Sequence, residues 1–128
     1  MNWNGPRLIG IRGVVCGERF PLFPGQTVLV GRSHACDIAL SKCRRWLELT
    51  PRQQAHDTEF NTVSRRHASI VFRMPDLMEI VDLSSNGTFI DNRQVTREVL
   101  RIVPGQTREI RLGTRETLRL EWAGSKTG

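Results

Sequence analysis

The sequence of 128 residues contains no tyrosine, two lysines and three cysteines. It also lacks any apolar run of the ~18 residues that a membrane-spanning helix needs. The first ten residues, MNWNGPRLIG, have neither the charged start nor the long apolar segment of a secretory signal. We therefore expect a cytoplasmic protein that does not insert into a membrane.

The three cysteines cannot all pair with one another, and without a secretory signal we expect reduced thiols. His34, Cys36 and Cys43 can be imagined as part of a metal site. Their spacing contains no Cys-x-x-Cys pair, however, and a fourth ligand would have to come from elsewhere. We expect no metal and no cofactor, and we interpret the cysteines, Cys16 included, as small buried or partly buried side chains.

Arginine supplies 17 of the 19 basic side chains, because lysine occurs only at Lys42 and Lys126, and the formal net charge is +6. The planar guanidinium suits phosphate and carboxylate. This composition favours an anionic partner, nucleic acid included, although a skewed genomic base composition would also enrich arginine. Against a nucleic-acid-binding protein, the few aromatic residues are scattered and no helix-turn-helix pattern is present.

The length suits one domain with a hydrophobic core and is too short for two. Hydrophobic residues make up 38% and charged residues 25%, as in a folded soluble domain. We expect a single domain over residues 1–128, with a core over about 7–123 and a polar tail at 124–128. Such a tail suits a free end or a linker to further domains.

Glycine, proline and asparagine divide the sequence into short apolar runs, a pattern typical of strands rather than helices. Apolar and polar residues alternate cleanly over 68–72 and 118–122. Strands are predicted over 8–15, 19–22, 27–30, 37–40, 68–73, 77–83, 88–91, 94–96, 108–112 and 117–122. Many short strands at close spacing predict an all-β sandwich.

Turn residues occur at four places between these strands. Pro-Gly pairs at 24–25 and 104–105 suit the central positions of type II turns. Asn86-Gly87 predicts a tight turn, and Asp91-Asn92 predicts the turn of a hairpin over 88–96.

Residues 41–62 interrupt the strand pattern. Their composition favours a short helix within 44–58, in which Pro51 takes the first turn after Thr50 as N-cap. A segment of this length is either an elaborated functional loop or a mobile insertion. Trp46 and Leu47 are predicted to attach it to the body of the domain.

Three polar fragments lie at predicted strand ends, where the loops of a sandwich can meet: GRS at 31–33, SRRH at 64–67 and SSNGT at 84–88. Ser64 and His67 alone would allow a nucleophile and its base. No acidic residue is identifiable to orient the histidine, and no glycine elbow surrounds the serine. We therefore expect no enzymatic activity.

Taken together and in this order, Gly31-Arg32, Ser64-x-x-His67 and Asn86-Gly87 resemble the signature of the forkhead-associated (FHA) domain family. The flanking segments DIAL at 37–40 and IVDL at 80–83 are also similar. The resemblance covers about residues 7–123, with 41–62 outside it. It implies an eleven-stranded antiparallel β-sandwich that binds phosphothreonine peptides through the loops at one end.

The resemblance also implies a role for each fragment. Arg32, Ser64, Arg65 and Ser85 match positions that approach the phosphate, which carries about −1.5 to −2 charge and three acceptor oxygens. Arginine donates charge-assisted hydrogen bonds to such a group. Asn86 matches an asparagine whose amide holds the peptide backbone with one donor and one acceptor.

The remaining motif residues are expected to support the loops. Gly31 and Gly87 permit close or unusual backbone conformations. His67 matches a structural histidine that fixes the serine, and Thr88 supports the turn. Arg66 is either solvated or lines the peptide groove.

The insertion is the departure from the family, in which this loop is usually short and helps to select residues after the phosphothreonine. Thr62 falls where some members carry a selectivity residue, and a neutral side chain there gives no charge preference. Four basic residues either favour acidic or doubly phosphorylated ligands or form a solvated basic helix: Lys42, Arg44, Arg45 and Arg52. The insertion can also cover the groove and weaken binding.

Our leading hypothesis is a module that binds threonine-phosphorylated partner proteins in Ser/Thr kinase signalling, with no small-molecule substrate. The alternatives are an FHA domain that mediates assembly without phosphate and, less favoured, a basic nucleic-acid-binding domain.

Overall fold

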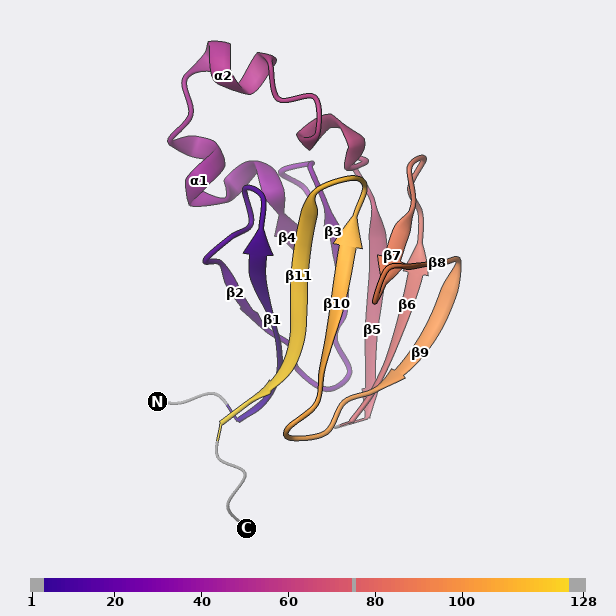
Figure 1. Cartoon of the computed structure of the whole chain (residues 1–128). Coiled ribbons are helices and arrows are strands. Elements are labelled where there is room, and N and C mark those ends of the chain that lie inside the picture. Colours follow the sequence, from indigo (N-terminus) through magenta and orange to yellow (C-terminus); the bar gives the residue numbers. More distant parts are fainter. Residues whose placement is uncertain (1–3, 75, 125–128) are drawn as a thin grey trace.

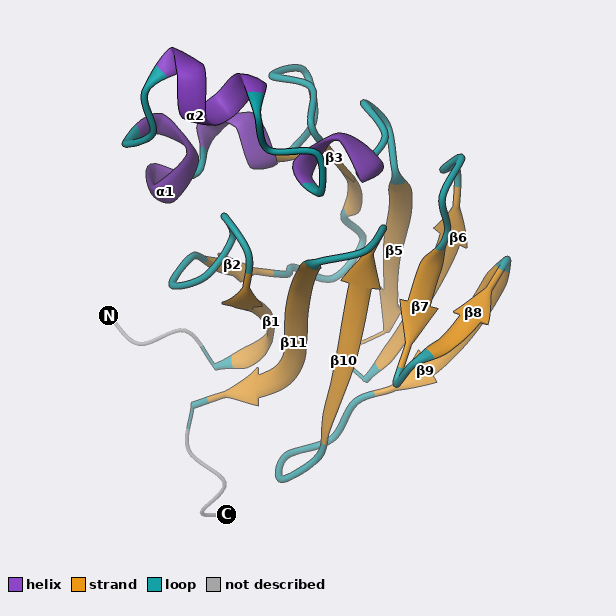
Figure 2. Ribbon diagram, turned by 45° about the horizontal axis from the view of Figure 1, so that its top comes forward, coloured by secondary structure: helices purple, strands orange, loops and turns teal. Residues whose placement is uncertain are grey.

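The computed structural model describes residues 4–74 and 76–124, in which eleven strands form two sheets packed face to face (Figures 1 and 2). The six-stranded sheet has the order β2-β1-β11-β10-β7-β8, and the five-stranded sheet has the order β4-β3-β5-β6-β9. The strands are β1 (Gly5–Arg12), β2 (Arg19–Pro21), β3 (Thr27–Gly31), β4 (Ile38–Ala39), β5 (Ala68–Met74), β6 (Leu77–Asp82), β7 (Thr88–Ile90), β8 (Arg93–Val95), β9 (Arg97–Arg101), β10 (Thr107–Leu112) and β11 (Glu116–Ala123). The predicted β-sandwich is confirmed, and its pairs are antiparallel except β3 with β4.

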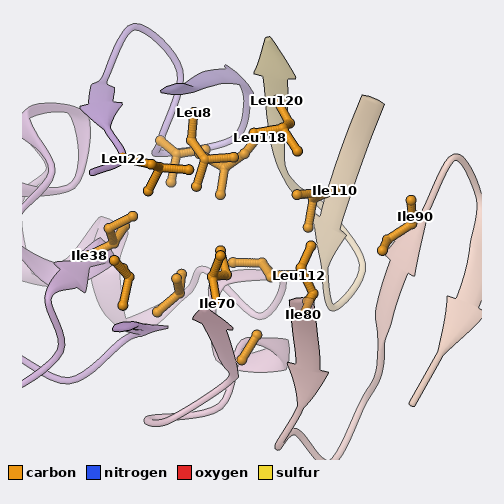
Figure 3. Packing of buried hydrophobic residues seen from close by; sticks show 14 of the residues in the cluster. Leu8, Leu22, Ile38, Ile70, Ile80, Ile90, Ile110, Leu112, Leu118 and Leu120 are labelled. Carbon is orange, nitrogen blue, oxygen red and sulfur yellow. The ribbon is translucent and has the colours of Figure 1, made fainter. Parts of the chain in front are cut away.

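The core fills the space between the two sheets, where the inward side chains of both meet (Figure 3). Alternation in β5 buries Ala68, Ile70 and Phe72, because every second side chain of a strand points to the same face. In β11 the same rule buries Leu118 and Leu120. The apolar period read from the sequence therefore sets which face of each strand forms the core.

The first strand begins and ends three residues earlier than the predicted range 8–15. β1 ends at Arg12, and the chain turns back so that the Gly17 amide donates to the Gly10 carbonyl. A Cβ at Gly10 would lie 1.7 Å from the Val15 carbonyl oxygen, so only glycine permits this close return. Val15 is buried in the loop and extends the apolar pattern beyond the strand.

Strand β9 was not predicted, because its sequence, REVLR, buries only Leu100 fully and exposes charged residues at the edge of the sheet.

The predicted turns are confirmed at Pro24-Gly25 and Pro104-Gly105, where both glycines have positive φ. Asp91 and Asn92 also have positive φ and join β7 to β8 as a hairpin. Asn86-Gly87 instead lies in the connection that carries the chain from one sheet to the other.

The insertion contains four short helical turns: η1 (Leu40–Lys42), α1 (Arg44–Leu47), α2 (Pro51–Ala55) and η2 (Phe60–Thr62). Thr50 caps α2 as predicted, with Pro51 in the first turn. The Thr50 hydroxyl accepts a hydrogen bond from the Gln53 amide, and the Gln53 side chain accepts one from the Thr50 amide. Trp46 stacks on Phe60, with ring centroids 3.7 Å apart, and packs against the core. The prediction that Leu47 attaches the insertion is wrong, because 62% of its surface is exposed.

The helices gather at one end of the sandwich, and the Gly5–Ala123 pair of β1 and β11 lies at the other (Figure 1). The helical end also carries the loops after β3, before β5 and after β6, together with the β10–β11 turn. In the described part of the chain, no helix is long and apolar enough to cross a membrane.

The central position of Ile80 in β6 makes it a sharp test of the core. Its side chain is fully buried, so Ile80→Ala should lower the free energy of unfolding by about 2–5 kcal/mol. Val99→Ala, at a side chain that is 56% exposed on β9, is the matched control and should cost less than about 1 kcal/mol. Equal losses in urea unfolding would contradict this assignment of the core face.

Candidate functional site

The register of the five-stranded sheet brings the three polar fragments together. Val30 pairs with Ala68, and Ala68 pairs with Asp82, so β3 ends, β5 begins and β6 ends at adjacent positions. The fragments beside these strand ends therefore form neighbouring loops. Figure 2 shows these loops at the end of the sandwich that also carries the helices.

Arg32 is attached to the loop that precedes β5. Its backbone amide donates to the Ser64 carbonyl at 3.1 Å, and its Nε donates to the Val63 carbonyl at 2.5 Å. Within the described residues, the two terminal guanidinium nitrogens of this half-buried side chain have no hydrogen-bond partner. The contact through Nε fixes the plane of the guanidinium and leaves its terminal donors available.

Ser64 connects two of the loops. Its Oγ accepts a hydrogen bond from the Ser85 amide at 3.1 Å, and its own amide donates to Nδ1 of His67 at 3.0 Å. The hydroxyl proton of Ser64 has no acceptor in the described part of the chain. Ser64 can thus donate to a ligand while its oxygen is held in place.

His67 is fully buried and joins the loop before β5 to the loop after β6. Since Nδ1 accepts from Ser64, the ring proton lies on Nε2, which donates to the Gly87 carbonyl at 2.9 Å. Burial lowers the pKa of His67, although the Gly87 carbonyl and the Asp82 carboxylate act in the opposite direction. Both ring nitrogens are used inside the protein, so this neutral histidine supports the loops and is not available as a catalytic base.

The loop after β6 is organised by Asp82, which the sequence analysis did not select. Its Oδ1 accepts hydrogen bonds from the Ser84 amide, the Ser84 hydroxyl and the Thr88 hydroxyl, at 3.1, 2.5 and 2.8 Å. The Ser84 hydroxyl in turn accepts from the Gly87 amide at 2.8 Å. An aspartate two residues before a serine at a strand end is the sequence signal for such a turn.

Ser85 and Asn86 are exposed at the tip of this loop. The Ser85 side chain makes no hydrogen bond to another described residue, whereas Nδ2 of Asn86 donates to the Thr62 carbonyl at 3.0 Å. Thr62 belongs to the insertion, and its hydroxyl donates to the Glu59 carbonyl and accepts from the Thr114 amide. That hydroxyl is thus engaged in the insertion and the β10–β11 turn.

The loop end carries positive charge without carboxylate partners. Arg65 and Arg66 are exposed and form no ion pair with any described residue. Nine other arginines form ion pairs with carboxylates: Arg7, Arg44, Arg73, Arg93, Arg97, Arg101, Arg108, Arg115 and Arg119. Five more form no ion pair with a described residue: Arg12, Arg19, Arg45, Arg52 and Arg111. Arg65 and Arg66 therefore place unpaired positive charge on the loop next to the donors of Arg32 and Ser64.

The side chains considered as metal ligands make separate contacts. His34 shares a hydrogen bond of 2.6 Å with Ser41, and the Cys36 thiol donates to the Arg65 carbonyl. Burial, with smaller effects of Glu18 and Glu116, raises the pKa of the Cys43 thiol to about 12. Among the described residues, no group of three or more His, Cys, Asp or Glu side chains is placed to bind a metal ion.

The close approach of β3 to the loop before β5 requires glycine at position 31. A Cβ there would lie 2.1 Å from the Arg65 carbonyl oxygen, which is backbone and cannot move alone. Gly31→Ala should therefore displace residues 64–67 and destabilise the domain by about 1–3 kcal/mol. Gly17→Ala is the matched control for the added methyl group, because that glycine has open space around it, although its φ of +91° adds some strain. Amide chemical shifts of 64–67 that stay unchanged in Gly31→Ala would contradict the contact.

The buried neutral His67 gives the domain a defined pH dependence. Its pKa is lowered on folding, so below pH ~6.5 the unfolded chain binds a proton that the folded chain does not. The free energy of unfolding should then fall as the pH drops through 6.5, by at most about 1.4 kcal/mol per pH unit from this group. An NMR titration of the imidazole that gives a midpoint at or above 6.5 would contradict the assigned tautomer and burial.

Comparison with known proteins gives a family match. The sequence model of the FHA domain matches residues 28–113, more than half of the chain. A comparison with curated proteins finds no match. Among solved structures, the FHA domain of the CT664 protein from Chlamydia trachomatis is 25% identical with a TM-score of 0.65, over 91% of this chain and 95% of that chain.

Two further structures have the same fold. The FHA domain of FhaA, solved in complex with the intracellular domain of Rv3910, is 26% identical with a TM-score of 0.59, over 90% of this chain and 99% of that one. A domain from a study of phosphothreonine-dependent FHA domain interactions is 23% identical with a TM-score of 0.63, over 98% and 100% of the two chains. FHA domains are interaction modules rather than enzymes. This chain belongs to the FHA domain family.

Proposed function

We propose that this chain is a phosphothreonine-peptide-binding module that recruits phosphorylated partner proteins in Ser/Thr kinase signalling. The observation that carries the proposal is the set of hydrogen-bond donors at the loop end. The terminal nitrogens of Arg32 and the hydroxyl of Ser64 are held in place by the protein and are left without acceptors among the described residues.

A phosphate group complements these donors in charge and in geometry. Phosphothreonine carries about −1.5 to −2 charge and three strong acceptor oxygens. Arg32 supplies charge-assisted hydrogen bonds, Ser64 supplies a neutral one, and the exposed Arg65 and Ser85 lie on the loops beside them. Because Arg32 and Ser64 are already oriented, binding costs less side-chain entropy than it would with free side chains.

Asn86 suits the role of holding the peptide backbone. One hydrogen of its Nδ2 is bonded to the Thr62 carbonyl, which fixes the plane of the amide. Its Oδ1 and its second Nδ2 hydrogen remain for a peptide N–H and C=O. Phosphate contacts and backbone contacts together would select a phosphorylated extended segment over free phosphate.

A protein partner fits what is known of a relative at 26% identity. The FhaA FHA domain was solved with the intracellular domain of another protein bound to it. By analogy, the ligand here is a threonine-phosphorylated segment of a partner protein, and the interaction needs no cofactor or small-molecule substrate.

A general nucleic-acid-binding role has less support. Most strand arginines are neutralised by neighbouring carboxylates, such as Arg73 by Glu79 and Arg101 by Asp76. These paired side chains offer less positive charge to a nucleic-acid backbone than the number of arginines suggests.

Arg32→Ala tests the proposal directly. Loss of its charge-assisted bonds should cost about 2–3 kcal/mol, which weakens binding of a phosphothreonine peptide roughly a hundredfold. The ligand comes from a threonine-phosphorylated peptide library, and affinity is measured by calorimetry with the dephosphorylated peptide alongside. Arg19→Ala, at an exposed residue of β2 that forms no ion pair with a described residue, is the matched control and should bind like the wild type.

Three results would contradict the proposal. Binding that is equal before and after phosphatase treatment would favour assembly without phosphate. Steeply salt-dependent DNA binding that survives Arg32→Ala would favour the nucleic-acid role. Unchanged phosphopeptide affinity in a folded Arg32→Ala variant would remove Arg32 from the site.

A further inference from the structure

Arg115 of the β10–β11 turn is attached to the insertion through a largely shielded ion pair with Asp57 and a longer, more exposed one of 3.7 Å with Glu59. The neighbouring Glu116, at the start of β11, binds the same guanidinium from the side of the sheet. Arg115 NH2 lies 2.9 Å from Oδ2 of Asp57, and Arg115 Nε lies 2.8 Å from Oε2 of Glu116. The side chains of these three residues are 20%, 13% and 0% exposed. Such pairs are screened less than surface pairs, so this contact fixes the insertion relative to the turn.

Asp57 uses its other oxygen to organise the last turn of the insertion. Its Oδ1 accepts a hydrogen bond from the Phe60 amide at 2.9 Å, at the start of η2. Phe60 is buried in the core and stacks on Trp46. Asp57 therefore connects Arg115 on the turn with the helical turn that ends at Thr62.

Thr62 transmits this arrangement to the exposed loop after β6. Its hydroxyl accepts from the Thr114 amide at 3.0 Å, next to Arg115 in sequence. Its carbonyl accepts from Nδ2 of Asn86 at 3.0 Å. A Cβ at Gly113 would lie 2.3 Å from Oγ1 of Thr62, so the turn and the insertion are in direct contact.

We propose that Asp57 and Arg115 are positioning residues for the phosphopeptide site. They orient the Asn86 side chain through Thr62 and do not touch the ligand. The inference rests on the proposed function. It makes the insertion a rigid part of the site rather than a mobile cover over it. An Asn86 amide that is oriented in advance loses less freedom when it binds a peptide backbone.

Asp57→Asn removes the charge of the ion pair with little other change. An asparagine Oδ1 can still accept from the Phe60 amide, whereas an amide NH2 in place of Oδ2 faces the Arg115 guanidinium as a second donor. Glu48→Gln is the matched control, because the Arg44–Glu48 pair lies on the same insertion, is 83% and 63% exposed, and lies within α1 and its C-cap.

The decisive measurement is a double-mutant cycle for phosphopeptide affinity, with folding checked for each variant. Asp57→Asn should weaken binding about tenfold, whereas Glu48→Gln should leave it unchanged. In an Asn86→Ala background, Asp57→Asn should weaken binding by less than about twofold, because the group that it positions is gone. Independent effects that multiply, or no effect of Asp57→Asn on its own, would overturn the proposal.

A ligand-free readout separates failure of this proposal from failure of the proposed function. In Asp57→Asn, the amide of Thr114 and the side-chain amide of Asn86 should exchange hydrogen at least about tenfold faster than in Glu48→Gln. If the wild type binds no phosphopeptide, the proposed function fails, and this exchange alone decides whether Asp57 positions Asn86. Equal exchange in the two variants would overturn the positioning role.

Discussion

The buried imidazole of His67 joins two loops that come from different places in the sequence. It accepts a hydrogen bond from the Ser64 amide and donates one to the Gly87 carbonyl, and it is completely shielded from water. A buried polar group without partners is costly, so this geometry is strongly preferred over alternatives that break either bond. The arrangement of Ser64 and Asn86 on the surface depends on this contact below them.

The Gly87 carbonyl extends the same arrangement to the other sheet. It accepts from Nε2 of His67 and also from the amide of Gly113 in the β10–β11 turn. That turn carries Arg115, which reaches the insertion through Asp57. Hydrogen bonds and an ion pair therefore link the loops at 64–67 and 84–88, the turn and the insertion, while the terminal nitrogens of Arg32 and the hydroxyl proton of Ser64 have no partner among the described residues.

The sequence predicted the fold well where burial follows a simple period, as in β5 and β11. It predicted the hairpin turn at Asp91-Asn92 and the cap at Thr50, because these depend on local chemistry. It missed β9, whose charged edge hides the strand pattern, and it wrongly buried Leu47. The motif residues of the site lie together, but the contacts of Asp57 with Arg115 join residues 58 positions apart, which no local pattern reveals.

The central claim is that the loop end is a preorganised phosphothreonine site. The most direct measurement is an amide NMR titration of the wild-type domain with a matched pair of peptides, one phosphorylated on threonine and one not. We expect the phosphorylated peptide to shift resonances of residues 31–33, 64–67 and 84–88 and the unphosphorylated peptide to leave them unchanged. Equal shifts with both peptides, or shifts confined to other surfaces, would contradict the claim.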